Sequence, residues 1–341
     1  MRAPAGLVIV ALLAGCPAAA QKSTPAVPAP PPILAAPAAP AASTPPDPAK
    51  IDLAFAAYQR GRYVTALKEA MIRLDASKTD APAMTLIGEL YAQGLGVRLD
   101  LAEAARWYRL AANLGNREAQ FALGMLNLQG RGLSRDRAIA RALLEAAAAQ
   151  GHSGAHYNLG IMALEGEAGQ SPPDFAAAAV SFQKSVELGD PDASYSLAIL
   201  YREGKGVIVN PARAAELLAI AAREKNPAAQ VELAVMLFNG DEPAQGDKPA
   251  RTGSGIPKDE AAAAKLFIAA AVRGNAIAQN RAARLLASGR GVREDQVEAS
   301  KWHVLARAAG IEDPFLDGVL NALTPQDKDK VDAAVKRVTG G

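Results

Sequence analysis

The same order of alanine, glycine and aspartate or asparagine returns six times between residues 83 and 313. Each unit begins at an alanine, and the six are Ala83, Ala119, Ala155, Ala193, Ala229 and Ala278. A period of 36 residues, which separates most of these alanines, is typical of stacked repeats rather than of one globular core. The pattern predicts units at 83–118, 119–154, 155–192, 193–228, 229–277 and 278–313.

Each unit carries the signals of two helices joined by a tight turn. A small residue that allows close helix packing comes five positions after the alanine: Gly88, Gly124, Gly160, Ala198, Ala234 and Ala283. A glycine that can end the first helix comes eleven positions after it: Gly94, Gly130, Gly166, Gly204, Gly240 and Gly289. A residue suited to cap the second helix follows: Asp100, Asp136, Asp174, Asn210, Asp259 and Asp295. Asp100 with Glu103, and Asp295 with Glu298, predict capping boxes.

The second helix ends at a further glycine in most units, at Gly115, Gly151, Gly189, Gly274 and Gly310. The fourth unit has Lys225 there, so either this lysine adopts a strained left-handed backbone or the turn differs. The Gly94–Gly96 turn also resembles a phosphate-binding loop. Because such a loop is unique in a chain and follows a strand, the recurrence of this turn favours a hairpin connection.

The composition agrees with packed helices and narrows the partners. Aromatic residues make up only 5% of the chain, and alanine is abundant, which favours helices over sheet. The net charge of +2, without a basic block, argues against nucleic acid as a partner. The single cysteine, Cys16, excludes an internal disulfide and a thiolate metal cluster.

The units resemble a known repeat family. The pattern A-x-x-x-L-G-x-x-Y-x-x-G-x-G-V-x-x-D-x-x-x-A-x-x-W-Y-x-x-A-A-x-x-G is similar to the Sel-one-like repeat (SLR), a relative of the tetratricopeptide repeat. The resemblance implies an all-α, right-handed α/α superhelical solenoid and usually a scaffold or adaptor role. Stacking of the hairpins predicts one continuous solenoid. Its expected spine comes from the second helices: Trp107, Leu143, Leu217, Leu266 and Trp302, with Phe182 beside the exception Ser181.

The regions flanking the repeats have their own signals. Residues 51–82 resemble a tetratricopeptide-type hairpin that turns at Gly61, and residues 314–341 are expected to form capping helices. Residues 21–50 predict a disordered linker, because ten prolines lie between Pro25 and Pro48. An insertion near 241–253, rich in proline, glycine and charge, predicts a surface loop between the helices of the fifth unit. It is interpreted either as a tolerated excursion or as a partner contact.

Residues 1–20 have the features of a signal peptide. Residues 13–16 (LAGC) resemble the bacterial lipobox, in which Cys16 is lipidated and becomes the new N-terminus. Cleavage near Ala20 competes with it and would release a soluble periplasmic form. Because Pro17 is not the aspartate associated with inner-membrane retention, the lipobox resemblance favours an outer-membrane lipoprotein, with no other membrane attachment than this anchor.

No catalytic or cofactor motif emerges from the sequence. His152 and His156 have the spacing of a metal pair, but His152 falls in a turn and a third ligand is lacking, so we expect no metal. His303 occupies the repeat position of Tyr108 and is expected in the core. Without a nucleophile motif, we expect a non-enzymatic scaffold that needs no cofactor. The alternative is a peptidoglycan-fragment binder or hydrolase.

The first helices suggest a partner groove, because in this family they line the concave wall. Positions 4, 5 and 8 after the starting alanine are expected to mark the buried side of the first helix. Positions 3, 6 and 10 then point to the opposite side. The candidate groove for a protein or peptide contains Met125, Asn158, Ile161, Glu165, Ser196, Ile199, Glu203, Glu232, Val235, Asn239, Arg281 and Arg284. The apolar members at position 6 are either this binding stripe or ordinary core covered by the next turn.

Overall fold

The computed structural model describes residues 52–166, 172–241 and 256–340. Over these residues the chain is helical and contains no strand, only an isolated bridge between Asp241 and Pro257. The all-α class is therefore confirmed. The helices group into two compact units, which meet in the chain between Asp190 and Pro191. This division falls close to the border of the third and fourth repeats.

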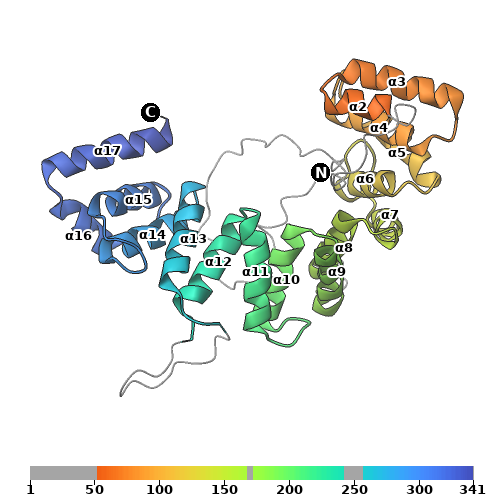
Figure 1. Cartoon of the computed structure of the whole chain (residues 1–341). Coiled ribbons are helices and arrows are strands. Elements are labelled where there is room, and N and C mark those ends of the chain that lie inside the picture. Colours follow the sequence, from red (N-terminus) through yellow and green to blue (C-terminus); the bar gives the residue numbers. More distant parts are fainter. Residues whose placement is uncertain (1–51, 167–171, 242–255, 341) are drawn as a thin grey trace, which may run out of the picture. The chain divides into compact units, whose positions relative to one another are not determined.

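Unit 1 is a series of helical hairpins. Its helices are α2 (Leu53–Gln59), α3 (Tyr63–Ala76), α4 (Ala81–Gln93), α5 (Leu101–Asn113), α6 (Arg117–Gln129), α7 (Arg137–Ala149), α8 (Ser153–Glu165) and α9 (Phe175–Glu187). Each helix packs on the next one along the chain (Figure 1). The pair α2 and α3 is the hairpin expected for residues 51–82, and it turns at Gly61 with a φ of 72°.

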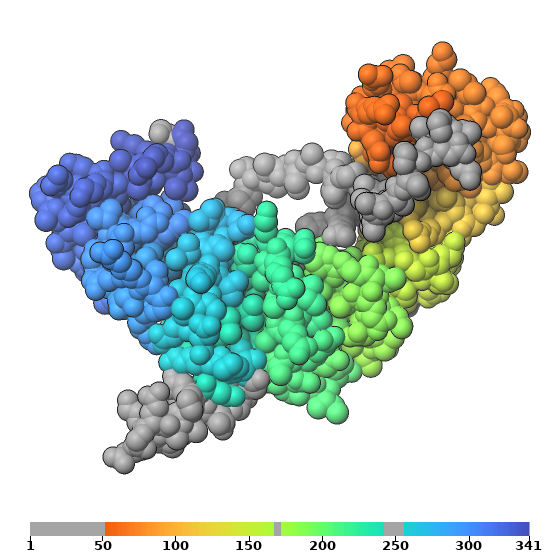
Figure 2. All heavy atoms as spheres, viewed as in Figure 1, coloured from red at the N-terminus to blue at the C-terminus, as the bar shows by residue number. Residues whose placement is uncertain are grey.

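Unit 2 continues the same construction. Its helices are α10 (Pro191–Glu203), α11 (Pro211–Arg223), α12 (Pro227–Phe238), α13 (Glu260–Val272), α14 (Ala276–Ser288), α15 (Gln296–Ala308), α16 (Pro314–Ala322) and α17 (Pro325–Thr339). Helices α10 to α16 pack in sequence, and α17 packs on α15. Within each unit the atoms of neighbouring hairpins are in direct contact (Figure 2). The last two helices, which begin at Pro314 and Pro325, lie in the segment 314–341 that was expected to form capping helices.

Side-chain caps start the helices, as the sequence predicted. All six expected caps accept a hydrogen bond from a backbone N–H: Asp100, Asp136, Asp174, Asn210, Asp259 and Asp295. The capping boxes, however, were predicted wrongly, because the glutamate side chain does not accept a hydrogen bond from the backbone N–H of the cap residue. The backbone N–H of Asp100 donates to the carbonyl of Tyr91 at 3.0 Å, so it is not open to Glu103, which pairs with Arg106 instead. Asp295 is engaged in the same way by Leu286.

The helix ends follow the predicted glycines with two exceptions. Lys225 has a φ of 65° and is the only non-glycine residue with positive φ among those described, which confirms the strained alternative. Gly240 was expected to end α12 in a left-handed conformation but does not have positive φ. There α12 stops at Phe238, and Gly240 packs so closely on the Lys258 backbone that an added Cβ would lie 2.6 Å from its nitrogen. Glycine is thus required at 240 for close approach.

The spine of the core lies one residue later in the second helices than predicted. Its fully or almost fully buried members are Tyr108, Leu144, Phe182, Leu218, Phe267 and His303. Leu217 and Trp302 are also buried, but Trp107, Leu143 and Leu266 are only half-buried. The reason is contact with the small residues of the first helices. A Cβ at Gly88 would lie 2.7 Å from the ring of Tyr108, and one at Gly160 would lie 2.6 Å from that of Phe182.

Several sequence predictions fall on residues outside the described ranges. These are the signal segment with Cys16, the linker and most of the insertion after Asp241. The ends of that insertion are joined, because the N–H of Asp241 donates to the carbonyl of Ile256 at 2.7 Å. The helices that the structure does describe are all too short or too polar to cross a bilayer.

Candidate functional site

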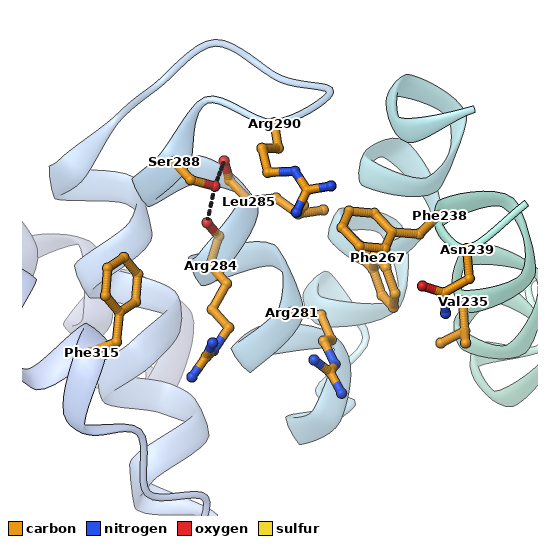
Figure 3. A pocket seen from close by; sticks show the side chains of 10 residues that line it. All are labelled: Val235, Phe238, Asn239, Phe267, Arg281, Arg284, Leu285, Ser288, Arg290 and Phe315. Atoms are coloured by element: carbon orange, nitrogen blue, oxygen red, sulfur yellow. Dashed lines mark hydrogen bonds between the residues drawn. The ribbon is translucent and has the colours of Figure 1, made fainter. Parts of the chain in front are cut away.

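A pocket of about 500 Å³ opens on unit 2 (Figure 3). It is formed by α12, α13, α14, the turn after α14 and the start of α16. The ten residues that line it are Val235, Phe238, Asn239, Phe267, Arg281, Arg284, Leu285, Ser288, Arg290 and Phe315. Its size lies in the range of small-ligand and side-chain pockets, and its wall combines phenyl rings with guanidinium groups.

The apolar part of the wall includes three phenylalanines. Phe267 belongs to the core spine and is only 3% exposed, so it forms a fixed floor. Phe315, in the first turn of α16, is 52% exposed, which is unusual for so large an apolar side chain. Phe238 stands at the end of α12 and is half-buried. Phe238 and Phe315 therefore leave apolar surface that a partner could cover.

Arg284 is held in place by a neighbour of the pocket. Its Nε and Nη2 donate to the two carboxylate oxygens of Asp313 at 2.5 and 2.8 Å, and Asn280 donates to the same carboxylate. The guanidinium also lies 5.7 Å from the ring centre of Phe315. Burial favours a higher pKa for Asp313, but the hydrogen bonds from Arg284 and Asn280 outweigh it and lower the pKa below its usual value. Asp313 therefore stays ionised and neutralises Arg284.

Arg290 is paired in a similar way on the other side. It forms a salt bridge with Glu260, the first residue of α13, and its guanidinium lies 4.4 Å from the ring centre of Phe238. The hydrogen bond from Arg290 is the main reason that the pKa of Glu260 is lowered, with Lys258 contributing as a second donor. The two carboxylates beside the pocket are therefore ionised at neutral pH. Neither is suited to donate a proton as a general acid.

Arg281 differs from the other two arginines. It is exposed on α14, and no carboxylate among the described residues pairs with it. Figure 3 shows its side chain projecting from α14 on the same side as that of Arg284. Arg281, Arg284 and Ser288 are spaced at three and seven positions, which places them on one stripe of the helix. The pocket thus carries one positive charge that its described surroundings do not compensate.

Four members of the candidate groove line this pocket: Val235, Asn239, Arg281 and Arg284. Three charged members lie elsewhere and are engaged within the protein. Glu165 pairs with Arg137, whereas Glu203 and Glu232 both pair with Arg202. The predicted groove therefore includes part of this pocket, namely the residues on α14 and at the end of α12.

The remaining members of the candidate groove are buried, which corrects the idea of an exposed stripe. Met125, Ile161 and Ile199 are at most 8% exposed, so for these three the core alternative holds. Asn158 and Ser196 are buried too, and each donates to a carbonyl four residues earlier in its own helix. The physical reason is that the first helices are covered on most sides by neighbouring hairpins. Val235, 36% exposed, is the one position-6 aliphatic residue that reaches the surface among those described.

Sequence reasoning missed six residues of the pocket, namely Phe238, Phe267, Leu285, Ser288, Arg290 and Phe315. One signal was present. The chain has only seven phenylalanines, and three of them line this single pocket. They occupy different positions of different helices, so the repeat alignment does not group them.

The predicted histidines have local structural roles. His152 caps α8, its Nδ1 accepting from the N–H of Ala155 at 3.1 Å while its Nε2 contacts Glu118 at 3.1 Å. Its ring stacks on Phe121 at 4.2 Å. His303 is fully buried beside Asp317, as expected for a core residue. Within the described parts of the chain, no three histidine, cysteine or acidic residues gather as a metal site would require.

Known proteins share this architecture. The chain resembles the Sel1 repeat protein of Oxalobacter formigenes, with 28% identity and a TM-score of 0.62 over 75% of this chain and 98% of the other. It also resembles c5321, a protective antigen of uropathogenic Escherichia coli with an SLR fold. The identity is 23% and the TM-score 0.50, over 84% of this chain and 67% of that one. No curated protein matched the chain.

The model of the Sel1 repeat matches seven segments, at residues 81–116, 117–152, 153–190, 191–226, 227–249, 251–275 and 276–311. Two of these, 227–249 and 251–275, contain α12 and α13, the two helices of the repeat that carries the insertion. The fifth expected unit is therefore matched as two segments, and the seven segments correspond to the same six hairpins that the sequence predicted. The matches extend over more than half of the sequence, and the chain belongs to the Sel1 repeat family.

Proposed function

We propose that this chain is a non-enzymatic scaffold of the bacterial cell envelope that binds a segment of a partner protein at the pocket of unit 2. Sel1 and tetratricopeptide-like repeats generally mediate protein–protein interactions. The observation that carries the proposal is the combination of half-exposed Phe315 with uncompensated Arg281 in one pocket. Exposed aromatic and arginine side chains are the types most enriched where partners bind.

The envelope location rests on the sequence of the first 20 residues. The lipobox-like LAGC stretch supports lipidation of Cys16, and the proline-rich residues that follow support a spacer between an anchor and the repeats. The test is the variant Cys16→Ser. Because several acyl chains anchor far more firmly than one, the variant should leave the membrane fraction almost completely. A mature wild-type protein whose mass begins at unmodified Gln21 would contradict the anchor.

The partner is sought by chemical crosslinking of the full chain in the native envelope, followed by purification. We expect a protein that is captured by the wild type and lost with the double variant Arg281→Gln/Phe315→Ala. The matched control is Arg293→Gln, which removes another exposed arginine of unit 2 that does not line the pocket. Equal capture by all three proteins would contradict a role for the pocket. A change in the mass of peptidoglycan fragments on incubation would instead favour a hydrolase.

A further inference from the structure

The charges around the pocket indicate the chemistry of its occupant. Arg284 and Arg290 each have a carboxylate partner in Asp313 and Glu260, so their charges are balanced inside the protein. Arg281 faces the same pocket without such a partner among the described residues. A ligand that covers the pocket would shield this exposed guanidinium from water, and there a carboxylate forms stronger hydrogen bonds than it does in bulk solvent. The complementary group is a single carboxylate.

The apolar wall indicates a second group on the same ligand. Phe267 gives a buried floor, and Phe315 leaves half of its surface open. The paired guanidiniums of Arg284 and Arg290 lie near the rings of Phe315 and Phe238, so they limit where an apolar side chain can enter. A leucine, phenylalanine or similar side chain would cover the open part of Phe315 at a gain of about 25 cal/mol for each Å² removed from water.

The length of the pocket limits how many residues can separate the carboxylate of the ligand from its apolar side chain. The stripe from Arg281 to Ser288 spans seven residues of α14, or about 10 Å at 1.5 Å per residue. An extended peptide advances about 3.3 Å per residue. About three residues of peptide therefore cross the pocket.

We propose that the pocket binds an extended peptide segment of a partner protein in which an aspartate or glutamate lies within about three residues of a large apolar side chain. The carboxylate binds Arg281, and the apolar side chain packs on the exposed ring of Phe315. This inference rests on the proposed function, because it names the partner chemistry of the same site. An internal acidic side chain is chosen over an acidic C-terminal residue because the latter brings two carboxylates to one unbalanced arginine.

The test begins with random twelve-residue peptides displayed within a carrier protein, so that no free C-terminus is present. They are selected on the full chain. We expect the bound peptides to be enriched in an acidic residue followed or preceded within three positions by a large apolar one. Selected peptides without enrichment of acidic residues would overturn the inference, as would a selection that yields no binder.

A synthetic peptide from the selection then tests the contact by fluorescence anisotropy. Arg281→Gln should weaken binding about tenfold, as expected when a charge-assisted hydrogen bond is lost. Replacing the acidic residue of the peptide by its amide should cause a similar loss, and the two changes together should add nothing further. Arg293→Gln is the matched control and should bind like the wild type. Circular dichroism verifies that all variants remain helical.

The outcomes separate this inference from the proposed function. If peptides bind but Arg281→Gln has no effect, the inference fails while peptide binding stands. If binding appears only after residues 242–255 are replaced by glycine and serine, the chain itself occupies the pocket, and the inference is overturned. If neither peptides nor crosslinked partners are found, the proposed function fails as well.

Discussion

The hydroxyl of Tyr108 on α5 donates a hydrogen bond of 2.8 Å to the carboxylate of Glu89 on α4, and both side chains are fully buried in unit 1. Gln93 donates to the same carboxylate. Burial, followed by the nearby Glu89, raises the pKa of Tyr58 to about 12, so this tyrosine of α2 remains a neutral neighbour at physiological pH. Glu89 stands where later repeats have Met125 and Ile161. A hydrogen-bonded polar pair thus replaces apolar packing at the first repeat.

The first prediction concerns this pair. Tyr108→Phe should destabilise unit 1 by about 1–3 kcal/mol, because a buried carboxylate loses its hydroxyl donor. The double variant Glu89→Ile/Tyr108→Phe copies Ile161 and Phe182 of the third repeat, and it should recover most of this loss, since both polar partners are removed together. Urea unfolding of the three proteins measures the effect. A double variant less stable than the single one would show that Glu89 is needed for other contacts.

The second prediction concerns helix approach at the small residues. The substitution Gly160→Ala should lower the free energy of unfolding by about 1–3 kcal/mol more than Gly124→Ala does. An added Cβ would lie 2.6 Å from the ring of Phe182 at Gly160, but 3.2 Å from the more adaptable Leu144 at Gly124. Both substitutions gain the same helix propensity, so the difference isolates the overlap with the ring. Equal midpoints of urea unfolding would contradict the close contact.

The third prediction concerns Lys225, whose φ is 65°. Lys225→Gly should exceed Lys225→Ala in stability by about 1 kcal/mol, because only glycine removes the strain of a left-handed backbone. Both variants remove the same ammonium group, so charge effects cancel in the comparison. Thermal unfolding followed by circular dichroism is the measurement. If the alanine variant is equally stable, the positive φ of this residue is not maintained in solution.

The fourth prediction concerns pH and the Asp313–Arg284 pair. The pKa of Asp313 is lowered in the folded protein, so its contribution to stability is present above its unfolded pKa of about 4. As the pH falls through the folded pKa, that contribution is lost. The stability difference between the wild type and Asp313→Asn should therefore be largest near pH 7 and shrink below pH 4. A difference that does not change between pH 7 and pH 3 would contradict the ionised pair.

The sequence was a good guide to features that depend on neighbouring residues. The N-cap of Asp136 and the glycine turn at Gly115 are determined within a few residues, so the pattern located them correctly. The strain at Lys225 was visible for the same reason. The capping boxes failed because the competing acceptor for the N–H of Asp100 is Tyr91, nine residues earlier in the chain.

The site was harder to predict because it depends on contacts between hairpins. Helix α6 is buried at almost every position from Ala119 to Asn127, so its apolar residues do not mark a single face. The periodicity could not tell that Met125 is covered. The pocket combines Phe267 of α13 with Phe315 of α16, which lies outside the repeats, and no spacing rule relates these two residues. The α14 arginines were found because they lie on an exposed stripe of one helix.

Within each unit, the packing of hairpins against their immediate neighbours has a consequence for the history of the gene. A stretch of DNA that encodes 36 residues adds or removes one α-helical pair, and every new joint repeats the same contacts between a small residue and a large one. Duplication or loss of such a stretch within a unit leaves no buried face uncovered, provided that α2–α3 still packs on the first repeat of unit 1 and α16–α17 on the last repeat of unit 2. Chains of this kind can therefore evolve in length by whole hairpins, and each added hairpin brings new positions on which selection for a partner can act.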